Sequence, residues 1–151
     1  MKKIMINIVL VLAMPLSWAQ TAPTWDLYGS QQLDDKGVPQ NISNQFTTKY
    51  PDQHHVTWHH YENGYIATYP DTSTKSTTGF IYDQSGTASG TAQWKKMSEL
   101  PPVVASKLYS TYPELKSQGF YMVATPDQRK KYVINANGEW ISFDENGIPV
   151  K

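Results

Sequence analysis

The chain has 151 residues, of which 39% are hydrophobic and 13% aromatic, and 13 basic residues balance 13 acidic ones. A neutral chain lacks the basic surface that contact with nucleic-acid phosphates requires, and so many aromatic residues are not typical of a disordered chain. Without cysteine the chain cannot form a disulfide, a thiolate zinc site or a cysteine nucleophile. The length fits one domain, or two small halves that share a core.

The N-terminus has the layout of a secretory signal peptide. Lys2 and Lys3 form a basic start, residues 4–15 form an apolar run, and the small residues Ser17 and Ala19 suit a cleavage site. The run is shorter than the roughly 20 apolar residues of a membrane-spanning helix, so stable membrane insertion is not expected. We expect cleavage after Ala19, which defines residues 1–19 as the signal peptide of a bacterial protein that is periplasmic or secreted.

The next segment, residues 20–36, has few regular features. Three of its residues, Trp25, Leu27 and Tyr28, are large and apolar enough to dock on a folded core. Residues 34–37 have the composition of a turn or loop. We treat residues 20–36 as a separate N-terminal segment.

Two short helices are predicted 62 residues apart. Each pattern starts with an apolar residue and a proline, continues with apolar residues at four-residue steps, and ends in Tyr-Pro. The first ends at Tyr50 and the second at Tyr112. The four-residue step is close to the helical period, which predicts one apolar stripe on each helix. A proline suits the first helical turn, and the proline after each tyrosine disfavours continuation of the helix.

Antiparallel strands are predicted after each helix. We expect strands at 56–61, 65–69 and 80–82 in the first half, and at 120–124, 132–135 and 140–143 in the second. The last strand of each half enters an Asp-x-x-Gly turn, which begins at Asp83 and at Asp144. Residues 71–79 are expected to form a polar loop.

The matching patterns predict an α+β fold made of two tandem helix-plus-antiparallel-sheet repeats. The first repeat is placed at residues 37–87, a linker at 88–97 and the second repeat at 98–151. The helices would lie on one face of a shared or adjoining curved sheet. A half of about 60 residues is marginally stable alone, so the two halves are expected to share a core.

The repeated unit resembles a known family. Val38 and Pro39, Tyr50 and Pro51, and the turn starting at Asp83 are similar to the PepSY-like proteins, which are grouped with the β-lactamase-inhibitor-protein-like fold. The resemblance covers residues 37–151 and implies a secreted or periplasmic protein. In the inhibitor relatives the open face of the sheet grips protein partners, and PepSY modules are suspected of restraining peptidases. The second half departs from the pattern, because Phe120 stands where the first half has Trp58.

The four histidines lie close together in the sequence. His59 and His60 are neighbours on a predicted strand, so their side chains point to opposite faces and cannot share one metal ion in a regular strand. His54 and His55 follow a Pro-Asp turn and are the candidate metal ligands, with Asp52 as a third. The alternative to a metal site is a polar strand start with partly exposed rings.

No catalytic signature is present. The repeated acids Asp83 and Asp144 are explained by their turns, and the sequence lacks a nucleophile elbow, a phosphate-binding glycine loop and a His-Glu-x-x-His helix. We therefore expect a protein that is not an enzyme and needs no cofactor.

Strand alternation divides the side chains between two faces. The predicted helix-bearing face holds Val56, Trp58, Tyr65, Ala67, Tyr69, Phe80 and Tyr82. The opposite face is expected to be open and rich in aromatic groups, which suit protein or peptide recognition. The candidate partner-binding residues on this face are Thr57, His59, Tyr61, Ile66, Ile81, Tyr121, Val133 and Trp140. The alternative is that the aromatic residues only stabilise the sheet.

Two functions are consistent with these features. The first is an exported non-enzymatic protein that grips a protein or peptide partner in the cell envelope through the open sheet face, with inhibition of a peptidase or another hydrolase as one form. The second is a periplasmic small-ligand or metal-ion carrier that uses the histidine cluster. The sequence leaves the identity of the partner and the oligomeric state open.

Overall fold

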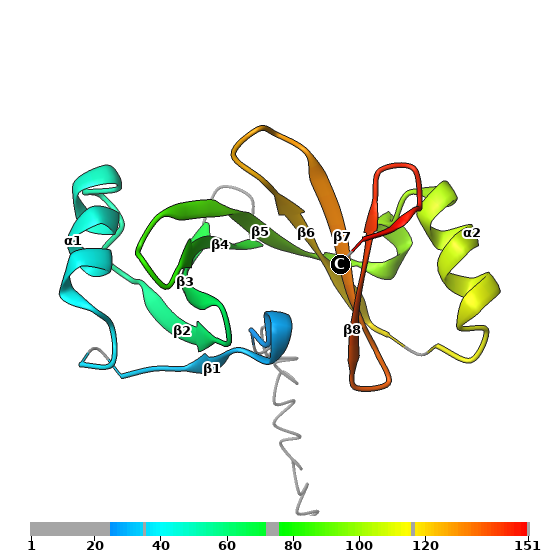
Figure 1. Ribbon diagram of the computed structural model, residues 1–151, viewed down its shortest axis with the longest axis horizontal. Coiled ribbons are helices and arrows are strands. Elements are labelled where there is room, and N and C mark those ends of the chain that lie inside the picture. Colours follow the sequence, from blue (N-terminus) through cyan, green and yellow to red (C-terminus); the bar gives the residue numbers. More distant parts are fainter. Residues whose placement is uncertain (1–24, 35, 72–75, 116, 151) are drawn as a thin grey trace, which may run out of the picture.

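The computed structural model describes residues 25–34, 36–71, 76–115 and 117–150. The expected signal peptide and its cleavage position lie outside these residues. The described chain forms one nine-stranded antiparallel sheet in which the strands follow each other in sequence order, from β1 to β9 (Figure 1). The strands are β1 Gln31–Gln32, β2 Thr57–Tyr61, β3 Gly64–Asp71, β4 Ser76–Asp83, β5 Ala88–Lys96, β6 Gly119–Ala124, β7 Lys130–Ala136, β8 Glu139–Asp144 and β9 Pro149–Val150.

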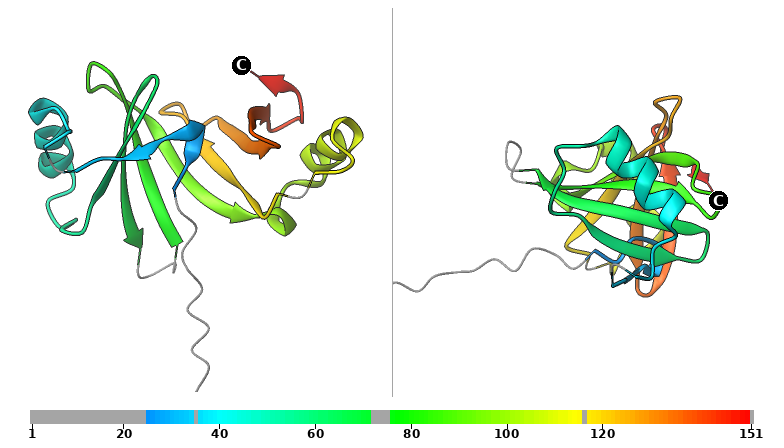
Figure 2. Two further views of the ribbon diagram at one scale, coloured as in Figure 1. Left: turned by 90° about the horizontal axis from the view of Figure 1, so that it is seen from below. Right: turned by 90° about the vertical axis from the view of Figure 1, so that its left-hand side faces the viewer.

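Two α-helices lie at opposite ends of the sheet (Figures 1 and 2). Helix α1 spans Gln40–Lys49 and helix α2 spans Pro102–Thr111. Both end at the predicted tyrosine, whose main-chain N–H still donates a hydrogen bond of 2.8 Å to the carbonyl four residues earlier. The chain then leaves the helical conformation at Tyr50 and Tyr112, as expected for residues that precede proline.

The segment that was expected to be a linker is a central strand. Residues 88–96 form β5, which pairs with β4 on one side and β6 on the other, for example Thr78 with Gln93 and Trp94 with Tyr121. The Gly, Ser and Thr content of this segment is typical of a loop, but strands on both sides satisfy its main-chain hydrogen bonds. The expected polar loop at 71–79 is also shorter, because β3 extends to Asp71 and β4 starts at Ser76.

Each helix packs on the same face of the sheet, which agrees with the predicted strand alternation. At one end, Ile42 and Phe46 of α1 lie in a cluster with Trp58, Ala67 and Tyr82. At the other end α2 contributes Val104 and Leu108 to a cluster completed by Leu100, Phe120, Tyr132, Ile134 and Phe143. The middle of this face, between the helices, carries half-buried side chains such as Gln93 and Met122.

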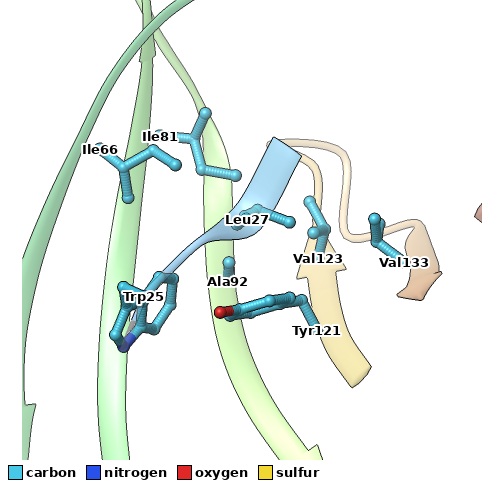
Figure 3. Close-up of a cluster of buried hydrophobic side chains, with 8 residues drawn as sticks. All are labelled: Trp25, Leu27, Ile66, Ile81, Ala92, Tyr121, Val123 and Val133. Carbon is cyan, nitrogen blue, oxygen red and sulfur yellow. The ribbon is translucent and has the colours of Figure 1, made fainter. Parts of the chain in front are cut away.

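A third hydrophobic cluster lies on the opposite face, at the centre of the sheet. Its members come from five strands and from the N-terminal segment (Figure 3). The short 3-10 helix η1, Leu27–Gly29, places the fully buried side chain of Leu27 in this cluster. The cluster consists of Trp25, Leu27, Ile66, Ile81, Ala92, Tyr121, Val123 and Val133.

The last strand of each half enters a turn with the same hydrogen bonds. Asp83 Oδ1 accepts the main-chain N–H groups of Ser85 and Thr87, and Asp144 Oδ1 accepts those of Asn146 and Ile148, all at 2.9 Å. The glycines that close these turns, Gly86 and Gly147, have φ angles of 89° and 73°. The predicted Asp-x-x-Gly turns are therefore present, with glycine at the left-handed position.

Candidate functional site: an aromatic cleft beside the N-terminal strap

The sheet face that was expected to be open is covered by the protein's own N-terminus. Residues 25–30, here called the N-terminal strap, cross its centre and pack against the strands (Figures 2 and 3). Five candidate partner-binding residues are buried on this face, and the remaining three, Thr57, Tyr61 and Trp140, are half-buried. The buried five are His59, Ile66, Ile81, Tyr121 and Val133.

The physical reason for this correction lies in the strap itself. Trp25 and Leu27 are buried on the apolar centre of the face, where Trp25 and Tyr121 have ring centroids 5.0 Å apart. A side chain at Gly79 would come within 2.7 Å of the Trp25 ring, so glycine leaves the space that this indole fills. Burial of such large apolar groups is strongly favourable, and an exposed patch of this composition would be costly.

His59 is a core residue rather than a surface contact. Its side chain is only 5% exposed, and its Nε2 lies 3.2 Å from Thr68 Oγ1. The Thr68 hydroxyl donates its one proton to the carbonyl of Thr57, so Nε2 of His59 must be the donor to Thr68. The other ring nitrogen, Nδ1, is buried without a hydrogen-bond partner among the described residues. Burial lowers the pKa of His59 from its usual 6.5, which favours the neutral ring.

The four histidines occupy different environments in this fold. His54, His55 and Asp52 all have exposed side chains, and His60 is exposed on the strand that buries His59. Within the part of the chain that the structure describes, no three His, Cys, Asp or Glu side chains are grouped closely enough to hold a metal ion. The geometry thus gives the metal-carrier hypothesis no support.

Beside the strap, the same sheet face has a cleft of about 180 Å³. Its floor includes the buried residues Tyr121 and Val133, which are paired neighbours on β6 and β7. Two half-buried tryptophans contribute to its lining, Trp94 from β5 and Trp140 from β8. The other lining residues are Asp26, Ser117, Gln118, Gly119 and Asn135.

The positions of the two tryptophans follow from the strands. Trp94 is paired with Tyr121 across β5 and β6, and Trp140 is paired with Asn135 across β7 and β8. Trp94 lies against Gly119, where a Cβ atom would come within 2.4 Å of the indole ring. The Trp140 ring lies 6.1 Å from the Tyr121 ring, so the tyrosine connects the floor to this tryptophan.

A carboxylate is held at the cleft by the strap. The Tyr121 hydroxyl donates to Asp26 Oδ1 at 2.8 Å, and the Asp26 main-chain N–H donates back to the same hydroxyl at 3.1 Å. Burial raises the pKa of Tyr121, so the phenol keeps its proton and can donate it to the carboxylate of Asp26. None of the described lining residues is Lys, Arg or His. The cleft therefore combines two indoles with one oriented negative charge.

Of the residues that line this cleft, Tyr121, Val133 and Trp140 belong to the partner-binding set predicted from the sequence, whereas Asp26 and Trp94 do not. Trp94 was missed because its segment was interpreted as a linker. The alternation of apolar Ala92 and Trp94 with polar Gln93 and Lys95 was the sequence signal that could have placed Trp94 on one face of a strand. Asp26 lies between Trp25 and Leu27, two residues that were recognised as able to dock, but sequence alone shows no partner for it.

No helix in the described ranges is both long and apolar enough to cross a membrane. No family model matches the chain, and no curated protein matches it. The PepSY part of the resemblance therefore stays an expectation.

The fold itself has known counterparts among solved structures. A DUF2874 family protein from Bacteroides ovatus ATCC 8483 superposes with a TM-score of 0.56 at 21% identity, over 75% of this chain and 84% of that one. A protein from Bacteroides eggerthii DSM 20697, described as a putative periplasmic protein, gives 0.57 at 15% identity, over 76% and 86%. A BLIP-like protein from Bacteroides fragilis NCTC 9343 gives 0.50 at 18% identity, over 79% and 89%. At these identities the likeness shows an α+β fold of the BLIP-like kind.

Proposed function

We propose that this chain is an exported, non-enzymatic binding protein that holds a protein or peptide partner at the aromatic cleft beside the N-terminal strap. The observation that carries this proposal is the placement of Trp94 and Trp140 on one cleft with the fixed carboxylate of Asp26. Tryptophan and tyrosine provide large contact areas with few rotamers to immobilise, which is why they are enriched at the centres of protein interfaces.

The proposed binding surface lies on the expected sheet face but is limited to the part that the strap leaves accessible. Trp140, Tyr61 and Thr57 remain candidates for direct contact, because they are half-buried. The buried residues of the original set, such as Ile66 and Val133, support the face from below. Their part in binding is to hold the strap and the cleft floor in place.

Two further points support an exported binding protein. The signal-like N-terminus and the likeness to a protein described as periplasmic both favour export. The acids Asp83 and Asp144 have structural partners in their turns, which favours a role outside catalysis. We include inhibition of a peptidase or another hydrolase within the proposal, because a BLIP-like protein has this fold.

We also propose that the two halves are tandem repeats of one unit. Helix α1 precedes three consecutive strands that end at the Asp83 turn, and helix α2 precedes three that end at the Asp144 turn. The cleft would then arise where β5 and the second unit meet the strap, which precedes the first unit.

Site-specific photocrosslinking in the native envelope tests the function. A photoreactive residue in place of Gln118, an exposed residue of the cleft, should capture a defined partner. The same group in place of Asp127, exposed in the turn at the other end of β6 and β7, is the control position. Capture should be lost when Trp94 and Trp140 are both changed to alanine in a chain that still folds, as judged by its thermal unfolding.

The outcomes are distinct. A partner that is captured from Gln118 and not from Asp127 supports the cleft, and loss of hydrolase activity in the captured partner supports inhibition. Equal capture from both positions, or capture that survives the double substitution, contradicts the proposed surface.

A further inference from the structure

The cleft has a chemical preference that can be deduced from its lining. We propose that it takes a single arginine side chain of the partner, stacked on the indoles of Trp94 and Trp140 and paired with the carboxylate of Asp26. This inference rests on the proposed function, because it names the chemical group through which the partner is recognised.

The size of the cleft favours one side chain. Pockets for drug-sized ligands typically enclose about 300–1,000 Å³, whereas this cleft encloses about 180 Å³. Its floor is apolar at Val133, and its polar groups are few. A flat group that enters edge-on or stacks on an indole makes the best use of such a space.

The charge of the cleft favours a cation. Asp26 is the one acid among the described lining residues, and none of those residues is basic. Its orientation is set by Tyr121, whose neutral hydroxyl donates one hydrogen bond and accepts another. A cation that enters the cleft therefore meets a carboxylate that is already positioned, and the entropy cost of orienting it has been met during folding.

The aromatic residues favour arginine over lysine. Indole is the best aromatic partner for a cation, and arginine is found in such contacts more often than lysine. The guanidinium is planar, is weakly hydrated and has five N–H donors, so it can stack on a ring and hydrogen-bond in its own plane. The side-chain amide of Gln118 offers a carbonyl oxygen for those donors, whereas Asn135 Oδ1 already accepts the main-chain N–H of Gly138 at 2.7 Å. A lysine ammonium is a compact, strongly hydrated charge that gains less from stacking.

The test uses the folded chain and small probes of matched shape. N-acetyl-arginine amide, N-acetyl-lysine amide and N-acetyl-citrulline amide are titrated while the indole N–H resonances of Trp94 and Trp140 are followed by NMR, with those of Trp25 and Trp58 as internal references. Citrulline has nearly the shape of arginine but no charge. We expect arginine to shift the Trp94 and Trp140 resonances, with citrulline and lysine each binding at least about tenfold more weakly, which corresponds to about 1.4 kcal/mol.

Variants locate the interaction. Asp26→Asn retains an oxygen that can accept from Tyr121 but removes the charge, and should weaken arginine binding about tenfold. Glu139→Gln removes the same charge from an exposed residue next to Trp140 that does not line the cleft, and should change binding less than twofold. Trp140→Ala should abolish the arginine-dependent shift of the Trp94 resonance. Trp140→Phe should recover part of that shift, which separates loss of the ring from loss of the fold.

The inference is overturned if citrulline binds as well as arginine, if Asp26→Asn leaves binding unchanged, or if lysine is preferred. It is also overturned if saturating arginine amide shifts neither cleft tryptophan. These results are separable from the crosslinking experiment. A partner captured at Gln118 without arginine selectivity would retain the proposed function and reject the arginine assignment. Arginine selectivity without a captured partner would show an arginine site in the cleft but reject the proposed capture of a protein partner.

Discussion

Tyr121 and Asp26, 95 residues apart in the chain, exchange two hydrogen bonds: the tyrosine hydroxyl donates to the carboxylate and accepts the aspartate's main-chain N–H. This pair fastens the N-terminal strap to β6 at the centre of the sheet. It also orients the carboxylate of the cleft.

Removal of the Tyr121 hydroxyl should loosen the strap. In Tyr121→Phe the ring is retained, but Asp26 loses both a donor to its carboxylate and an acceptor for its N–H. We expect the free energy of unfolding to fall by about 1–2 kcal/mol, measured by urea denaturation. Tyr109→Phe is the matched control, because Tyr109 is exposed on α2. An equal effect of the two substitutions would contradict the assigned role of the pair.

Leu27 should be the main apolar anchor of the strap. Its side chain is fully buried between strands of both halves, so Leu27→Ala should lower the free energy of unfolding by about 2–5 kcal/mol. The main-chain amides of the strap should also become less protected from hydrogen exchange. Val103→Ala, at a 46% exposed position on α2, is expected to change stability by less than about 0.5 kcal/mol. A well-protected strap in Leu27→Ala would show that other contacts hold it.

His59 should make the fold sensitive to mild acid. Its pKa is lowered in the folded state by burial, so the unfolded chain binds the proton more readily. The stabilising contribution of the neutral ring is complete above the unfolded pKa of about 6.5 and is lost as the pH falls through the lower folded pKa. Urea denaturation between pH 7 and pH 5 should show this loss, with a slope from this group of at most about 1.4 kcal/mol per pH unit.

The control for this pH dependence is His55, an exposed histidine four residues earlier. His59→Gln should remove the dependence between pH 7 and pH 5, whatever its effect on stability at neutral pH. His55→Gln should retain it. If the two variants lose stability with acid in the same way as the wild type, the buried ring is not its source.

Gly86 should be needed both for its backbone angle and for contact with α1. Its φ of 89° is strained for other residues, and an added Cβ would lie 3.1 Å from Ile42 Cγ1. Gly138 has a φ of 97° with no atom within 4 Å of an added Cβ, so Gly138→Ala measures the backbone cost alone, about 1–3 kcal/mol. Gly86→Ala should cost more than Gly138→Ala in thermal or urea unfolding. Equal costs would mean that α1 moves away without penalty.

The local structure was largely predictable from the sequence. The proline-bounded helices, the strands around Trp58 and Phe120 and the Asp83 and Asp144 turns all follow from rules that act within a few residues. The assignment of Trp58, Ala67 and Tyr82 to the helix-bearing face was also confirmed, because alternation along a strand needs no knowledge of its neighbours.

The predictions were wrong where a residue's environment depends on residues that are distant in the sequence. Residues 88–96 look like a linker alone, but they become a central strand because β4 and β6 supply hydrogen-bond partners on both sides. Likewise, nothing near Ile66 or Tyr121 in sequence indicates that residues 25–30 pack against them. The same long-range packing hid the cleft, since Asp26, Trp94 and Trp140 meet only after the sheet has formed.

The sequence by itself determined the two helices, most of the strands with their two faces, and the absence of cysteine chemistry, because these depend on residue type and short-range periodicity. The tertiary structure decided which face is covered and where an accessible aromatic surface remains. The covered face is decided by packing between residues far apart in the sequence, because the strap buries Trp25 and Leu27 on the apolar centre of the sheet.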